Sequence, residues 1–291
     1  MTISTGEPID YALTKMELLT ADIRVVIPVF NQLSYTVNCV ESLNRDGIRD
    51  SQIVIVNNAS TDETAEFLAS RPEIRAIHNS TNRGCGYAWN QGAKTAASPW
   101  TVVLNNDVLI APNTMRELVR FAVKGAFEVV SPAMCECELD YDFQSHAKEF
   151  VQAMSPACRR GVAFAVCFMV HRRVFDSIGY FDDGPKLGGY EDDEFFRRVR
   201  RAGFRMAITG RAFLHHFGSV TQKSIKASLN QPNMSLGDLA YYRKKTGQTW
   251  PKRKWAQLQT AVRSQWWKTT ERLRYGRSLH EKRIGGKWHY C

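Results

Sequence analysis

The chain has 291 residues, 44% of them hydrophobic, and a formal net charge of +10. This length can bury a sizeable core, as one large domain or two small ones, and the apolar content is ordinary for a globular protein. No apolar run reaches the roughly 18 residues that a membrane span needs. The N-terminus has neither a basic segment nor an apolar one, so we expect no signal peptide and a cytoplasmic protein.

Short β-branched runs alternate with helical stretches in the first third of the chain. Strands are expected at 24–30, 53–56, 74–77 and 100–104, and helices at about 34–44, 62–69 and 87–97. This alternation predicts βαβ units and a parallel sheet, and therefore an α/β fold. Ser60 and Glu63 have the spacing of a capping box at the start of the second helix.

Beyond Asp107 the alternation is looser. We expect a helix from Pro112, strands at 127–130, 161–171 and 204–209, and a helix at 191–202. Gly203 is a good residue to end that last helix. Residues 135–156 are polar and mixed, which indicates an irregular stretch.

The seven cysteines show no CxxC spacing. Cys135 and Cys137 form a CxC pair, but no second Cys or His pair follows at zinc spacing. Reduced thiols are therefore favoured over a zinc site.

Polar segments follow three of the apolar strands. They are Pro28–Asn31, Asn57–Asp62 and Asn105–Asp107. Ligands bind at the carboxyl ends of the strands in open α/β sheets. Three polar segments at the same end of three strands therefore predict a ligand site at that edge.

Four successive acids, Glu191 to Glu194, open the amphipathic run YEDDEFFRRVRRAG. Acids at a helix N-terminus interact well with the helix dipole, which is one explanation of the cluster. Asp107 lies upstream after an apolar strand, and His215 and His216 lie downstream in AFLHHFGS. Two acidic sites and a histidine indicate a divalent metal and a general base around one substrate.

Six motifs occur in the order seen in family 2 glycosyltransferases: VVIPVFNQ, IVIVNNASTDET, NRGCGYAWNQG, VVLNNDV, GYFDD with GGYEDDEFFRRVRRAGFR, and HHFGS. The chain resembles this family over about residues 23–246, and most closely its bacterial rhamnosyltransferase-like members. The resemblance implies a GT-A fold, which is a Rossmann-like nucleotide-binding fold with a central, mostly parallel sheet. It also implies a nucleotide-sugar donor, Mn²⁺ or Mg²⁺, and inversion at the anomeric carbon.

The resemblance also divides the chain. Residues 22–110 would form the nucleotide-sugar-binding half of one GT-A domain, and residues 111–247 its acceptor-binding half. Residues 248–291 lie beyond the resemblance as a basic, tryptophan-rich tail, which we expect to be helical.

The same resemblance assigns the donor pocket. Asn57 stands where the family more often has an Asp, and Arg83 lies near the base or phosphate unless it is a solvated loop charge. Asn105 replaces the first Asp of the metal motif. The residues implied to bind the nucleotide sugar are Pro28, Val29, Asn31, Asn57, Asn82, Arg83, Gly84, Asn105 and Asn106.

The metal and the base follow in the same way. Asp107 would be the main carboxylate ligand, and His216 would complete metal or diphosphate binding. His215 is the alternative for this role, and the histidine could instead be packed in the core without a role in binding. Asp192 matches the family's general base, with Glu191 beside it. Clustered acids raise one another's proton affinity, which helps a base near neutral pH. We expect Asp193 and Glu194 to cap the helix and to lie on its solvated face.

The positive charge is concentrated in the tail. Fourteen Lys or Arg and two acids fall between Arg243 and Cys291, which gives this segment +12 and residues 1–242 −2. Five of the seven tryptophans also lie there. Such a segment suits an anionic membrane surface, which would place the protein peripherally on the inner face of the cytoplasmic membrane, or less well a nucleic acid. A solvated basic helix whose tryptophans pack on the main domain fits equally.

We expect an inverting glycosyltransferase that moves a sugar from a UDP-, dTDP- or GDP-sugar to a glycan or lipid-linked acceptor, in cell-surface glycan synthesis. Two alternatives are a glycosyltransferase that modifies a protein or nucleic acid, and a non-catalytic nucleotide-sugar binder. A dinucleotide oxidoreductase is disfavoured because no GxGxxG follows the first strand.

Overall fold

The computed structural model describes residues 22–95, 98–184, 190–218, 220, 235–247 and 249–291. The N-terminal stretch, where no signal peptide is expected, lies outside these residues, as do residues 96 and 97 of the third expected helix. Among the described helices, none is long and apolar enough to cross a membrane.

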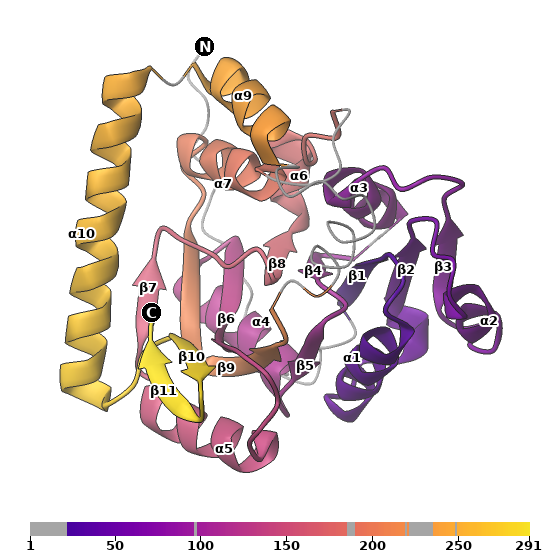
Figure 1. The fold of residues 1–291 in the computed structure, drawn as a ribbon, viewed down its shortest axis with the longest axis horizontal. Coiled ribbons are helices and arrows are strands. Elements are labelled where there is room, and N and C mark those ends of the chain that lie inside the picture. Colours follow the sequence, from indigo (N-terminus) through magenta and orange to yellow (C-terminus); the bar gives the residue numbers. More distant parts are fainter. Residues whose placement is uncertain (1–21, 96–97, 185–189, 219, 221–234, 248) are drawn as a thin grey trace.

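One mixed sheet of eleven strands runs through the described part of the chain (Figure 1). Its main path has the order β11-β10-β6-β8-β4-β1-β2-β3, and β9 pairs with β5, β6 and β7 beside it. The strands are β1 Ile23–Val29, β2 Ile53–Asn57, β3 Arg75–His78, β4 Trp100–Leu104, β5 Val108–Ile110, β6 Val129–Glu136, β7 Cys158–Arg160, β8 Cys167–His171, β9 Met206–His216, β10 His280–Ile284 and β11 Lys287–Tyr290.

The first half of the sheet is parallel, as the alternation of strands and helices predicts. β1 pairs in parallel with β2 on one side and with β4 on the other, and β2 pairs in parallel with β3. Every residue of β2 and β4 is buried, as expected for strands that helices cover on both faces. β8 then runs antiparallel between β4 and β6.

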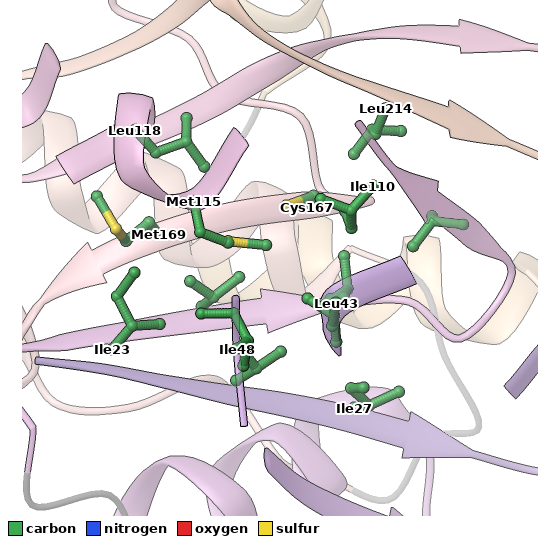
Figure 2. Packing of buried hydrophobic residues seen from close by; sticks show 14 of the residues in the cluster. Ile23, Ile27, Leu43, Ile48, Ile110, Met115, Leu118, Cys167, Met169 and Leu214 are labelled. Carbon is green, nitrogen blue, oxygen red and sulfur yellow. The ribbon is translucent and has the colours of Figure 1, made fainter. Parts of the chain in front are cut away.

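Helices cover both faces of this sheet. Buried residues of α1 and α4 pack on one face with Ile23, Ile27 and Met169 (Figure 2). Buried residues of α3, α6 and α7 pack on the other face around Phe168. The helices are α1 Leu33–Arg45, α2 Thr64–Ala69, α3 Cys85–Thr95, α4 Thr114–Gly125, α5 Phe143–Met154, α6 Arg172–Ile178, α7 Glu191–Arg201, α9 Ser235–Thr246 and α10 Trp250–Tyr275.

The expectation of an irregular stretch at 135–156 is wrong. β6 continues to Glu136, and residues 143–154 form α5, whose N-terminus the Asp142 carboxylate caps by accepting from the backbone N–H groups of Gln144 and Ser145. The apolar residues of α5 are spaced at helical intervals and buried, while its polar residues face outward, so the composition looked mixed. The expected strand at 161–171 is shorter, because only 167–171 is strand.

The expected helical tail is present as α10, but residues 280–290 form a hairpin that joins the main sheet. β10 pairs in parallel with β6, and β11 closes the hairpin. The buried Arg159 side chain of β7 donates two hydrogen bonds of 2.8 Å to Glu271 of α10. The tail is therefore part of the folded domain and not a separate appendage.

Candidate active site

The loops after β1 and β2 are bonded to one another. The Asn31 N–H donates to the Ser60 hydroxyl at 2.8 Å, and the Asn31 side-chain oxygen accepts from the Thr61 N–H at 2.7 Å. Asn31 has φ 55°, in the left-handed region that asparagine tolerates better than most residues. Ser60 is therefore engaged with Asn31, and the predicted capping box is absent. Just before α2, the Asp62 carboxylate accepts from the Thr64 N–H at 3.2 Å.

The remaining two residues predicted on β1 differ in exposure. Pro28 is half-buried and opposite Val56, whereas Val29 is buried in the main core. The Val29 carbonyl accepts from the Asn58 N–H at 2.7 Å. Val29 can therefore shape the donor pocket through its backbone, and its side chain belongs to the core.

Two asparagines at the end of β2 hold the neighbouring loops. The buried Asn57 accepts from the Ser60 N–H at 2.8 Å, and its amide nitrogen lies 3.3 Å from Nδ1 of His78. Asn58, which was not predicted from the sequence, is also buried; it donates to the Asn82 side chain at 2.8 Å and accepts from the Arg83 N–H at 3.1 Å. These bonds hold the 82–84 loop beside β2.

Arg83 is exposed, and its guanidinium lies 3.6 Å from the centre of the Tyr87 ring. Gly84 has φ +84°, which favours glycine at this turn. A Cβ on Gly86 would lie 2.5 Å from the Asp182 carbonyl oxygen. Gly86 therefore allows the start of α3 to approach the Asp182 loop, and the close contact there is with protein.

The NND segment follows β4. The Asn105 N–H donates to the Val166 carbonyl at 2.9 Å. The buried Asn106 side chain donates to the Thr36 hydroxyl of α1 at 3.0 Å, so this amide anchors the segment on α1. Asp107 is left as the carboxylate at this strand end.

Asp107 and His216 meet in the interior. Asp107 Oδ2 lies 3.4 Å from His216 Nε2, and both residues are buried. The pairing of β5 with β9 produces this contact, because it sets Val108 opposite His216. Burial by itself raises the pKa of Asp107, but the hydrogen bond and electrostatic attraction of His216 outweigh it, and the pKa is lowered overall. Asp107 is therefore an ionised carboxylate at neutral pH.

Glu136 is a site residue that was not predicted from the sequence. It lies opposite His216 where β6 pairs with β9, and its Oε2 is 3.9 Å from His216 Nδ1. Its pKa is lowered to about 2, chiefly by a hydrogen bond with His280 and then by Lys282. Nothing local in C-E-C marks this residue; only the pairing of distant strands brings it to His216.

His215 points to the other face of β9. It is fully buried, and its Nδ1 lies 2.9 Å from the Tyr141 hydroxyl and 4.0 Å from the Cys137 sulfur. The structure thus brings His216, and not His215, to Asp107.

Cys135 and Cys137 are close to His215, and together they have the residue types of a metal site. The two sulfurs are 3.1 Å apart. Two thiolates on one tetrahedral zinc would be roughly 3.8 Å apart, given Zn–S bonds of about 2.3 Å. All seven cysteines are free thiols. The sulfur–sulfur distance therefore fits hydrogen-bonded thiols better than two zinc ligands.

Asp192 lies in the first turn of α7 and is half-buried. Its pKa is raised, first by burial and then by the charge of Asp193. Cys85 links this cluster to the other one: its thiol pKa is raised to about 12 by burial and then by the charges of Glu191, Asp192 and Asp107. Charges from both acidic clusters thus contribute to the raised pKa of this one thiol.

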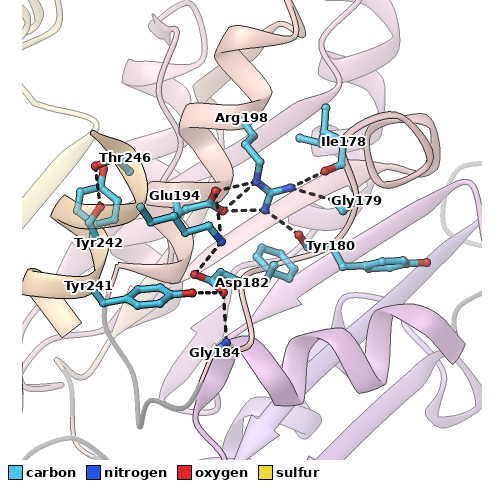
Figure 3. A network of polar contacts seen from close by, with 12 residues as sticks. Ile178, Gly179, Tyr180, Asp182, Gly184, Glu194, Arg198, Tyr241, Tyr242 and Thr246 are labelled. Atoms are coloured by element: carbon cyan, nitrogen blue, oxygen red, sulfur yellow. Dashed lines mark hydrogen bonds and ion pairs between the residues drawn. The ribbon is translucent and has the colours of Figure 1, made fainter. Parts of the chain in front are cut away.

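Glu194 is not on a solvated face, so that expectation is wrong. It is buried, and Arg198 donates to both of its carboxylate oxygens at 3.0 and 2.9 Å (Figure 3). Arg198 also donates to the carbonyls of Ile178 and Tyr180 at 2.6 and 2.7 Å. This network fixes the chain that leads into the GYFDD loop. Asp193, by contrast, is exposed.

Asp182 in the GYFDD loop is bound by α9. Lys245 Nζ lies 2.9 Å from its carboxylate, and the Tyr241 hydroxyl donates to it at 3.3 Å. The pKa of Asp182 is lowered because these bonds outweigh the effect of burial. Asp182 is therefore an anchor for α9.

Known proteins are similar to this chain in sequence. An uncharacterised glycosyltransferase of Rickettsia typhi is 24% identical over 189 residues, which cover 61% of this chain and 58% of that protein. The succinoglycan biosynthesis protein ExoO of Rhizobium meliloti is 31% identical over 104 residues, which cover 35% of this chain and 30% of that protein. The chain thus spans less than two thirds of these relatives.

Two solved structures share the fold at 17% sequence identity. TarS of S. aureus has a TM-score of 0.53, covering 67% of this chain and 60% of that one. GalNAc-T7 with UDP, GalNAc and Mn²⁺ has a TM-score of 0.55, covering 67% of this chain and 43% of that one. The fold is therefore GT-A, as expected. The sequence model of glycosyl transferase family 2 matches residues 24–183, and the chain belongs to that family.

Proposed function

We propose that the chain is an inverting glycosyltransferase that moves a sugar from a nucleotide-sugar donor to an acceptor hydroxyl. The observation that carries this proposal is the buried Asp107–His216 pair, 3.4 Å apart, in a chain that belongs to glycosyl transferase family 2. A metal-binding carboxylate and a general base on opposite sides of one anomeric carbon are what in-line displacement requires.

The donor half is residues 22–110. The nucleotide of a UDP-, dTDP- or GDP-sugar lies against Pro28, the backbone of Val29 and the Asn31 and Asn57 loops. The 82–84 loop, held by Asn58, forms the neighbouring wall, and the exposed Arg83 reaches the base or a phosphate. The acceptor half is residues 111–247.

Asp107 and His216 suit a divalent cation of the Mn²⁺ or Mg²⁺ type. They offer one carboxylate oxygen and one imidazole nitrogen 3.4 Å apart, and the carboxylate is ionised. The Glu136 carboxylate lies 3.9 Å from the other imidazole nitrogen. Such ions prefer carboxylate oxygens and diphosphate, and when bound the ion supplies Lewis-acid stabilisation of the leaving diphosphate. GalNAc-T7 was solved with Mn²⁺.

Asp192 takes the proton of the acceptor hydroxyl as that oxygen attacks the sugar. Burial and the neighbouring Asp193 raise its pKa, which makes it a stronger base than an ordinary aspartate. Glu191 lies one residue before it on the same turn of α7. The Glu194–Arg198 network keeps this helix fixed against the acceptor loop.

The acceptor is a glycan or a lipid-linked sugar in cell-surface glycan synthesis, on the inner face of the cytoplasmic membrane. The name of ExoO, a succinoglycan biosynthesis protein, supports this setting. The transferred sugar is a rhamnosyl or other hexosyl or deoxyhexosyl group. A non-catalytic binder is disfavoured, because the sequence retains Asp107, Asp192 and His216.

A donor panel tests the proposal. The purified protein is incubated with UDP-, dTDP- and GDP-sugars and Mn²⁺, and release of the nucleoside diphosphate is measured. We expect slow hydrolysis of the nucleotide sugars of one class in the absence of an acceptor. A chelator should abolish this release of the nucleoside diphosphate. A protein that binds a donor but never cleaves it, with any acceptor extract, would be a binder and not a transferase.

A further inference from the structure

Helix α10 carries an exposed apolar stripe. Trp255, Leu258, Val262, Trp266 and Leu273 are 62%, 56%, 62%, 68% and 82% exposed. Their spacing of three, four, four and seven residues places them on one face of a helix with 3.6 residues per turn. A row of large apolar side chains that long marks an interaction surface.

The opposite face of α10 is anchored to the protein. Glu271 is buried and paired with Arg159, whose guanidinium also lies 5.5 Å from the Trp267 ring. The helix stands at the edge of the molecule (Figure 1). Because these contacts fix its rotation, the apolar stripe faces away from β7 and from the core.

Basic residues flank this stripe on both sides. A helical projection places Lys252 and Arg263 on one flank and Lys254 and Arg272 on the other. The single acid between residues 250 and 275 is Glu271, which is already paired with Arg159. A second copy packed on the stripe would bring like charges together, whereas an anionic surface would complement them.

We propose that the stripe of α10 docks the protein on an anionic lipid bilayer. Tryptophan and leucine enter the headgroup boundary while flanking lysines and arginines meet anionic headgroups, which is the arrangement of an interfacial helix. A nucleic acid would use the basic flanks but would leave the apolar stripe exposed. The stripe therefore favours lipid over a purely electrostatic partner.

The docked helix is connected to the acceptor side of the site through α9. α9 ends at Thr246, whose carbonyl accepts from Arg197 of α7 at 2.9 Å, and Lys245 binds Asp182. Tyr190, at the N-terminus of α7, stacks on Tyr242 of α9. These contacts link the docked helix to the acceptor side, which suits a lipid-anchored acceptor. This last step rests on the proposed function, whereas lipid binding itself does not.

Vesicle binding of the full-length chain tests the docking. Flotation is measured with phosphatidylcholine vesicles and with vesicles that also contain phosphatidylglycerol, at low and high salt. We expect binding to the anionic vesicles only, weakened at high salt, with quenching of tryptophan fluorescence by brominated lipid. Trp255→Ser with Trp266→Ser should lower vesicle affinity by at least about tenfold, and the control Gln257→Ser with Thr260→Ser, off the stripe, should not.

Three results would overturn the proposal: no anionic vesicle binding, equal vesicle binding by the tryptophan variant, or a dimer in solution that the tryptophan variant dissociates. No donor is present in this assay, so it is independent of transfer. If the vesicles bind and no nucleotide sugar is ever cleaved, the proposed function fails and the docking stands. If the chain transfers sugar but ignores anionic vesicles, the docking fails and the proposed function stands.

Discussion

The imidazole of His216 lies against the carboxylate of Asp107, with 3.4 Å between Nε2 and Oδ2. The two residues are far apart in the chain and meet because β5 pairs antiparallel with β9. The contact keeps Asp107 ionised although it is buried. A buried, ionised carboxylate beside an imidazole is a ready pair of ligands, and a metal between them would replace their direct contact.

Asp107→Asn should abolish transfer, because an amide of the same shape lacks the charge that a divalent cation requires. The affinity for nucleoside diphosphate, measured by calorimetry with and without Mn²⁺, should lose its metal dependence in this variant. Thermal melting checks that the variant is folded. Full turnover of the wild-type enzyme in excess chelator would contradict the metal assignment.

Asp192→Asn should leave donor binding intact and lower transfer by about 10² to 10⁴, the usual scale for general base catalysis. The amide preserves the shape and hydrogen bonding of the side chain but cannot take a proton. Steady-state rates and donor affinity are measured on the same preparation. Near-normal transfer would move the role of base to Glu191.

Asp193→Asn should shift the acidic limb of the pH–rate profile to lower pH. Asp192 must be deprotonated to act as a base, so activity falls as the pH drops through its pKa. The charge of Asp193 raises that pKa, and removing the charge lowers it. Glu73→Gln, at an exposed acid before β3, is the control for net charge. An acidic limb that stays in place, or moves to higher pH, would show that Asp192 is not the group observed.

The parallel half of the sheet is predictable from the sequence because each element there carries its own signal. β1, β2 and β4 are β-branched runs of the right length, and α1 and α3 follow their expected ranges closely. α5 was missed because its apolar residues are diluted by a polar outer face. The β10–β11 hairpin was missed because its strands are short and basic, and its stability comes from pairing with β6, which no local pattern reveals.

Part of the candidate site carries a signal in the sequence. Asp107 stands out in the sequence because it follows an apolar strand, and Asp192 because it lies at the start of an amphipathic helix. Glu136 and Asn58 carry no such mark, since one acts through a strand pairing and the other through loop-to-loop hydrogen bonds. The expectation for Glu194 is wrong because nothing in the run of four acids separates it from its neighbours, and its burial with Arg198 appears only in the fold.

The tail should prove essential for stability, because its anchor is a buried ion pair. Glu271 also accepts from the Ser278 hydroxyl at 3.1 Å and from the Leu279 N–H at 2.9 Å, so it holds the turn into β10. Glu271→Ala leaves Arg159 buried without its partner and should lower the free energy of unfolding by about 3–5 kcal/mol. Urea denaturation measures this change.

Two further variants make the comparison specific. Glu271→Gln keeps hydrogen bonds but removes the charge. Its free energy of unfolding should therefore lie between those of the wild type and Glu271→Ala. Asp176→Ala breaks the exposed pair with Arg172, 60% and 39% exposed, and should cost under about 0.5 kcal/mol because solvent screens such pairs. Equal costs for Glu271→Ala and Asp176→Ala would mean that α10 is only loosely attached. In that case a protein truncated after Gly247 would still fold. If Glu271→Ala is instead strongly destabilised, we expect the truncated protein not to fold.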